Sequence, residues 1–408
     1  MTLDPTRQLP GTAVTANEAL FDGMVRHQTH LLRMAGSVRN EIFELLNATE
    51  ADIARRIRDS IRTGISPANL IRAERVMRAI QRIRGAAWDK IDTLTRKTFN
   101  DLVLAEARFA GAVVKTTAPV LIDSTLPSVS QLKALLESSP FEGRFLREWS
   151  SKLRADDLAR IQSQIRIGVV QGEPTPTVAQ RIVGTARRRG TDGVTQITRR
   201  QAEGVVRMAT NHFANQARRE FMLENSEFFQ EELYVATLDS ATTAICRSLD
   251  GRRFPVGQGP YPPVHFACRS LRVAVFDGGA LGERPAKPIT QRQVLREFTG
   301  NKRIGNVTSR DKLPHGTKSA FDRFLRQRTR EMTGPVPAKV TYERWLKTQS
   351  KAFQDDTLGI IKAKLFRQGK LPLDRFVAAD GTELSLRDLA RSDAAAFRAA
   401  GLDPKDFT

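Results

Sequence analysis

Residues 239–272 read DSATTAICRSLDGRRFPVGQGPYPPVHFACRSLR and hold the features that decide the fold. They contain both cysteines of the chain, Cys246 and Cys268, and a Gly- and Pro-rich run, 257–263, that sustains neither a helix nor a sheet ladder. On either side lie short segments rich in β-branched and apolar residues, 233–238 and 271–276. The segment therefore predicts two strands that are joined through a loop and form a small sheet.

The chain before residue 225 predicts helices almost throughout. Leu31, Met34, Val38, Ile42 and Leu45 recur at spacings of three and four, which places them on one helix face. Two further runs of this kind follow before residue 100, and residues 128–225 predict shorter helices separated by turn signals. We therefore expect an α+β fold that is predominantly helical, with long N-terminal helices and a small β element.

Composition and turn signals divide the chain into four predicted regions. They are an N-terminal helical region (1–127), a helical domain with the small sheet (128–280), a basic flexible linker (281–337) and a small α+β module (338–408). Aromatic residues are expected to anchor the last of these, namely Tyr342, Trp345 and Phe353.

The charge balance predicts a polyanionic partner. The 65 Lys and Arg residues against 45 Asp and Glu residues give a formal net charge of +20. Nucleic acid is the leading candidate, because each neutralised phosphate releases a counterion. The basic runs expected to touch phosphates are Arg187, Arg188, Arg189, Lys302, Arg303, Arg310, Lys312 and Lys318. Arginines also fill one face of the helix around residues 72–84, which is typical of a solvated face or of a surface for DNA or an acidic partner.

Two cysteines in 408 residues exclude a disulfide framework and favour a reducing compartment. No apolar run approaches the roughly 18 residues that a spanning helix needs, and the first 16 residues lack a signal-peptide core. We expect a protein that is made in a cytoplasm and does not enter a membrane.

The segment 239–272 also carries an ordered motif. Its positions are Asp239, Cys246, Leu249, Asp250, Gly251, Phe254, Pro262, Pro263, His265, Cys268 and Arg269. In this order they resemble the core of the Mu F-like minor head proteins, the phage head morphogenesis family of tailed bacteriophages. Residues 338–408 look like the tail module that follows this domain in many such proteins.

The resemblance implies a minor capsid protein that aids head assembly and DNA packaging or ejection. Such a protein is expected inside the capsid of the virion, near the portal, in several copies. The implied partners are the portal protein, the major capsid or scaffold protein and the packaged double-stranded DNA, after assembly in the host cytoplasm.

A zinc site is incomplete in this version of the motif. The family pattern has further cysteines where this chain has Thr243 and Ser270. Only Cys246, His265 and Cys268 remain, with Asp239 or Asp250 as a candidate fourth ligand, whereas structural zinc takes four. We therefore expect no metal and no other cofactor, with zinc as the alternative.

No catalytic signature is present, because the sequence lacks a Walker A loop, a Rossmann glycine pattern, His-Glu-x-x-His and Gly-x-Ser-x-Gly. We expect that the protein is not an enzyme. One alternative is a nuclease with His265 as general base and Arg269 as anion-binding partner. The interpretation we favour is that His265 bonds a backbone carbonyl and Arg269 pairs with Asp239 or Asp250. A second alternative is a nucleic-acid-binding protein that acts outside the virion without sequence preference.

Overall fold

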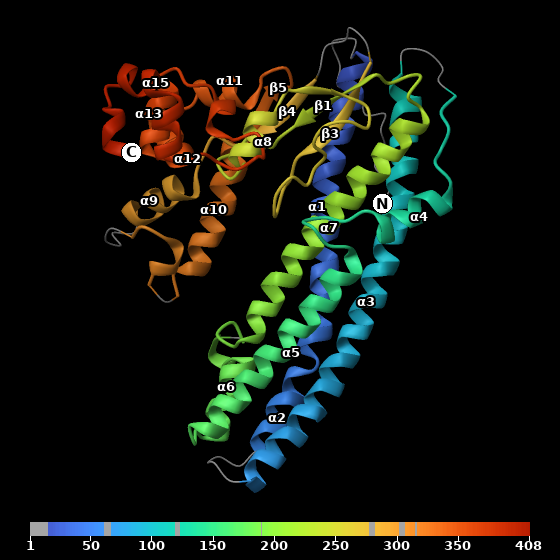
Figure 1. Cartoon of the computed structure of the whole chain (residues 1–408), viewed down its shortest axis with the longest axis vertical. Coiled ribbons are helices and arrows are strands. Elements are labelled where there is room, and N and C mark those ends of the chain that lie inside the picture. The colour runs from blue at the N-terminus through green and yellow to red at the C-terminus, as the bar shows by residue number, and fades with distance from the viewer. Residues whose placement is uncertain are drawn as a thin grey trace.

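The computed structural model describes residues 15–60, 67–118, 123–188, 190–276, 282–301, 307–314 and 316–408. A long helical bundle carries a small sheet and a C-terminal module at one end (Figure 1). The expectation of a predominantly helical α+β fold is confirmed. Within the described residues, no helix combines the length and the apolar character needed to cross a membrane.

Four long helices form the bundle: α1 (Ala16–Asn47), α3 (Pro67–Thr117), α5 (Leu146–Val170) and α7 (Thr195–Glu224). The apolar stripe of α1 is buried, as its spacing predicts, and it packs with Phe99 of α3 and Phe213 of α7 in one core. The shorter helices α2 (Glu50–Ser60) and α6 (Thr175–Val183) cover one half of α3 and α5, while α4 (Val129–Ser138) lies at the other end. Residues before and after position 127 therefore share one core.

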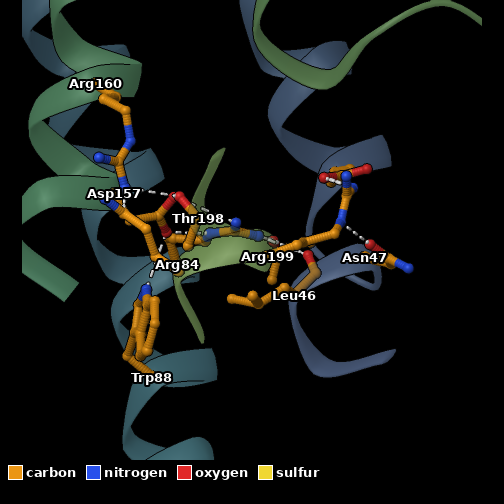
Figure 2. Close-up of polar contacts among 11 residues, drawn as sticks. Leu46, Asn47, Arg84, Trp88, Asp157, Arg160, Thr198 and Arg199 are labelled. Atoms are coloured by element: carbon orange, nitrogen blue, oxygen red, sulfur yellow. Dashed lines mark hydrogen bonds and ion pairs between the residues drawn. The ribbon is translucent and has the colours of Figure 1, made fainter. Parts of the chain in front are cut away.

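A fully buried ion pair crosses this bundle (Figure 2). Arg84 of α3 donates to Asp157 of α5 over 2.7 Å, and both side chains are at most 1% exposed. Asp157 also accepts from Trp88 at 2.9 Å and from Thr198 at 2.7 Å, while Arg84 reaches the carbonyl of Leu46 at 2.6 Å. We call these residues the buried arginine network. The arginine face expected around residues 72–84, whether solvated or a binding surface, was wrong for Arg84, because its side chain enters the core.

The sheet has the order β2-β1-β3 and is antiparallel throughout. Its strands are β1 (Glu231–Val235), β2 (Arg253–Pro255) and β3 (Leu271–Val275), so the two predicted strands are confirmed and β2 is a third strand that the sequence did not predict. Strand β2 and the short helix α8 (Ala244–Leu249) lie between the two predicted strands, and the Gly- and Pro-rich run 257–263 is a loop, as predicted. The sheet packs against the adjacent ends of α1, α3 and α7.

The expectation of a flexible linker at 281–337 is corrected by the described part of that region. It forms β4 (Glu283–Ala286), α9 (Gln291–Asn301), η2 (Arg310–Lys312), α10 (Lys318–Met332) and β5 (Gly334–Pro337), and β4 pairs with β5. Val294, Phe298, Leu313 and Phe321 close a small core between α9 and α10. The apolar residues between the basic ones therefore suffice to fold the segment.

The C-terminal module, residues 338–408, is helical in the structure. Its elements are α11 (Tyr342–Lys347), α12 (Lys351–Leu358), α13 (Ile360–Arg367), η3 (Leu373–Phe376), α14 (Leu386–Ser392), α15 (Ala394–Ala399) and η4 (Pro404–Phe407). The expected anchors Tyr342, Trp345 and Phe353 are all buried in its core. Its expected β content is reduced to one isolated bridge, between Val377 and Glu383.

Candidate functional site

The structure gathers Cys246, His265 and Cys268 into one group, the thiol–imidazole cluster. Cys246 lies on α8, and the other two lie in the turn that leads into β3. The Cys246 sulfur is 3.1 Å from His265 Nε2 and 3.7 Å from the Cys268 sulfur, and both thiols are buried. The three candidate ligand atoms all lie within 4.8 Å of one another.

Helix α7 holds the thiol–imidazole cluster in place through a hydrogen-bonding residue, Asn211, and a packing residue, Gly204. Asn211 donates its side-chain amide to the carbonyl oxygens of Cys268 (3.1 Å) and Ser270 (3.3 Å). Gly204, two turns earlier, seats the ring of Phe266, because a Cβ at this position would lie 2.2 Å from Phe266 Cζ. The cluster therefore depends on contacts between the bundle and the loop, which no local sequence pattern reveals.

The hydrogen bond between the two thiols lowers the pKa of Cys268 and raises the pKa of Cys246. The bond from Cys246 holds the pKa of Cys268 well below its ordinary range, against the effect of burial. The same bond, together with burial, raises the pKa of Cys246. Burial alone would lower the pKa of His265, but its contact with Cys268 raises it. These directions favour the charged forms of Cys268 and His265 relative to the isolated side chains.

The cluster supplies three of the four ligands of a structural zinc site. Asp239 and Asp250, the candidate fourth ligands, lie outside it, and no further Cys, His, Asp or Glu among the described residues joins the group. Thr243, at the family's first cysteine position, has a buried hydroxyl without a hydrogen-bond partner in the structure. The residues therefore do not fit a closed four-ligand site.

Asp239 pairs with Arg269, as expected. The guanidinium binds both carboxylate oxygens, at 2.6 and 2.8 Å. Burial alone would raise the pKa of Asp239, but the Arg269 contact outweighs it and lowers that pKa. The Asp239 carbonyl accepts from the Tyr342 hydroxyl at 2.7 Å. Asp239 therefore links the motif to the C-terminal module through its hydrogen bond with Tyr342.

Asp250 is the centre of a second buried ion pair, which the sequence did not predict. Arg284 of β4 donates to its two carboxylate oxygens at 2.7 and 2.6 Å, and the backbone N–H groups of Ala236 and Tyr342 complete its shell. Arg284 also donates to the carbonyl of Val340 at 2.6 Å. Gly251, the next motif residue, has a φ of +79°, a conformation that glycine adopts at no steric cost. We call Asp250, Arg284 and Tyr342 the module junction.

The proline-rich loop is held by Arg272. Its guanidinium lies between the rings of Phe254 (4.7 Å) and Tyr261 (4.4 Å) and donates to the carbonyl of Pro260. It also contacts buried Glu232, whose pKa burial raises to about 7 although Arg272 acts to lower it. Pro263 follows a cis peptide bond within this loop. The loop is thus braced internally around the motif.

Both candidate groups of the nuclease hypothesis already have partners. His265 Nε2 faces the Cys246 sulfur, and Nδ1 lies 2.8 Å from the carbonyl oxygen of Phe266. The Arg269 guanidinium is occupied by Asp239. The geometry is that of a structural element rather than of an exposed base beside a free cation.

Of the basic residues expected to contact nucleic acid, those that the structure describes lie in two separate regions. Arg187 and Arg188 are exposed on η1 (Ala186–Arg188), which follows α6 of the bundle. Arg310 pairs with Asp322 at 2.5 Å, and Lys318 caps the carbonyl of Asp311, near exposed Lys312 in the region of α9 and α10. Arg189, Lys302 and Arg303 lie outside the described residues.

Comparison with known proteins gives one family match. Residues 159–272 match the model of the family described as phage Mu protein F like protein. The match begins within α5 and ends in β3, so it contains the thiol–imidazole cluster and all eleven predicted motif residues. No curated protein and no solved structure matches the chain.

Proposed function

We propose that this chain, whose residues 159–272 carry the phage Mu protein F like match, is a minor head protein at the portal vertex. The family implies a role in phage head morphogenesis. The proposal adds a position inside the capsid and contact with packaged DNA, in support of assembly and of DNA packaging or ejection. The match is the single observation that carries it.

The shape of the bundle supports a role as an assembly component. Helix α3 alone has 51 residues, which gives roughly 75 Å at 1.5 Å per residue. A rod of this length offers a long lateral surface to a neighbouring protein, while the module junction holds the sheet and the C-terminal module at one end (Figure 1). The net charge of +20 favours a place beside DNA.

The motif supports a structural role within that proposal. Ion pairs that join parts of the fold involve Asp239, Asp250 and Arg269. Both ring nitrogens of His265 have a hydrogen-bond partner. A nuclease built on His265 and Arg269 would need these groups to face its substrate.

Co-expression with the portal protein of the same phage tests the proposed position. We expect the two proteins to co-elute from size exclusion, and mass photometry to show a complex that persists at high salt. A basic protein of similar size and charge serves as the control, because its attraction to the portal would be screened. Failure to associate, with DNA cleavage by the free chain that His265→Ala abolishes, would favour the nuclease instead.

We also propose that the thiol–imidazole cluster works without metal, since the protein supplies three ligands and the acids nearby are paired. Elemental analysis of the purified chain should find zinc far below one ion per molecule, and a chelator should leave the melting temperature unchanged. One zinc ion per chain, lost in Cys246→Ser together with stability, would contradict this expectation.

A further inference from the structure

A hollow lined by arginines lies between α3 and α5, away from the motif. Its volume is about 600 Å³, and its lining consists of Arg75, Arg78, Gln81, Arg82, Gly85, Ala86, Asp89 and Arg154. We call Arg75, Arg78, Arg82 and Arg154 the arginine groove. It belongs to the part of the bundle that precedes the matched segment.

Helical spacing builds one side of the groove. Arg75, Arg78 and Arg82 are separated by three and four residues, so they form one stripe on α3. Gly85 continues the stripe, and a Cβ there would lie 2.8 Å from a terminal nitrogen of Arg154. The glycine therefore lets Arg154 of α5 lie across α3, where Asp89 holds it at 2.6 Å.

The charge of the groove is poorly compensated. Arg78 approaches Glu74 only at 3.9 Å, and both side chains are more than 60% exposed. Within the described part of the chain, Arg75 and Arg82 form no ion pair. Asp89 compensates Arg154 and Glu74 lies beside Arg78, so the positive charges of Arg75 and Arg82 are left without an acidic partner among the described residues. Positive charges gathered around one hollow favour an added anion.

We propose that the arginine groove binds the phosphate backbone of double-stranded DNA without reading its sequence. Guanidinium groups match phosphate oxygens in geometry as well as in charge. From Arg75 to Arg82 the helix rises about 10 Å, which is about three times the axial rise of 3.4 Å per phosphate of one DNA strand. The contact gives the proposed place beside packaged DNA its physical basis, and in that respect it rests on the proposed function.

The lining favours DNA over an acidic protein. Ala86 is its one apolar side chain, whereas the centre of a stable protein interface is apolar and loses its water. The lining also contains no aromatic ring on which the bases of a single strand could stack. A hydrated, highly charged duplex fits these properties best.

The test compares two triple variants of the full chain. Arg75→Gln/Arg78→Gln/Arg82→Gln removes three of the four positive charges of the arginine groove. The control, Arg323→Gln/Arg326→Gln/Arg330→Gln, removes the same charge with the same spacing from exposed positions of α10. Binding to a labelled duplex of mixed sequence is followed by fluorescence anisotropy between about 50 and 200 mM salt. Melting temperatures report whether each variant is folded.

We expect the groove variant to bind at least about tenfold more weakly, and its salt slope to fall by about two to three contacts. The α10 variant should stay within about twofold of the unmodified chain. Equal losses in both variants, or no DNA binding by the unmodified chain, would overturn the proposal. So would a groove variant that keeps DNA binding but no longer co-elutes with the portal protein, because the groove would then serve a protein. If the unmodified chain binds DNA but does not co-elute with the portal protein, the proposed position in the head would be overturned instead.

Discussion

Asp157→Ala should lower the free energy of unfolding by about 3–5 kcal/mol, because it leaves the Arg84 charge buried without a partner. Arg84 and Asp157 are at most 1% exposed, so water cannot replace the lost carboxylate. Trp88 and Thr198 would lose their acceptor at the same time. Urea denaturation followed by far-ultraviolet circular dichroism measures the effect.

The chain offers a matched control for this experiment. Asp89 and Arg154 also form an ion pair between α3 and α5, but their side chains are 67% and 42% exposed. Asp89→Ala should therefore cost less than about 1 kcal/mol. Similar losses for Asp157→Ala and Asp89→Ala would contradict the assignment of the buried arginine network to the bundle core. The double change Arg84→Met/Asp157→Leu should recover part of the lost stability, because it leaves no isolated charge.

Arg284→Ala should cost a similar amount, about 3–5 kcal/mol, and it should loosen the C-terminal module. The change leaves buried Asp250 without its cation, although the carboxylate still accepts from the N–H groups of Ala236 and Tyr342. It also removes the donor to Val340, next to the start of the module. In limited proteolysis, the segment between β4 and α11 should then be cleaved faster than in the unmodified chain, and a fragment close to residues 338–408 should be released.

Arg253→Ala is the control for the module junction. Arg253 pairs with Glu231 across β2 and β1, and both side chains are about half exposed (47% and 48%). Its removal should leave the protease pattern unchanged. If Arg284→Ala keeps the pattern of the unmodified chain, the Asp250–Arg284 pair does not hold the module in place.

Local patterns predicted the bundle and the main strands because both depend on periodicity. The stripe that begins at Leu31 is buried along α1, and the segments near 233 and 271 pair as β1 and β3. The position of Arg84 could have been predicted as well. It follows Ile80 by four residues and precedes Ala87 by three, so the spacing itself places it on the apolar face.

Charge content misled the prediction for residues 281–337. Val294, Leu295 and Phe298 repeat at helical spacing among the basic residues, and with Phe321 they form the small core. The abundance of Lys and Arg concealed that pattern, because a helix with a narrow apolar stripe resembles a polar linker in composition.

The candidate site was predicted in its residues but not in its partners. The ordered motif identified Cys246, Asp250, His265 and Cys268, which the structure places around α8 and the start of β3. The Asp250–Arg284 pair joins residues 34 apart, and the Tyr342 contact joins residues 92 apart. Such contacts follow from the tertiary fold, and no local spacing specifies them.

The measurement that tests the central claim most directly is the protein composition of purified phage particles. Quantitative mass spectrometry of DNA-filled heads, normalised to the portal protein, should find this chain in a small and fixed number of copies per particle. Its retention after the particles are washed at high salt should distinguish an internal component from adsorbed basic protein. Absence of the chain from washed particles, with abundant free protein in the infected cell, would contradict the proposed role in the head.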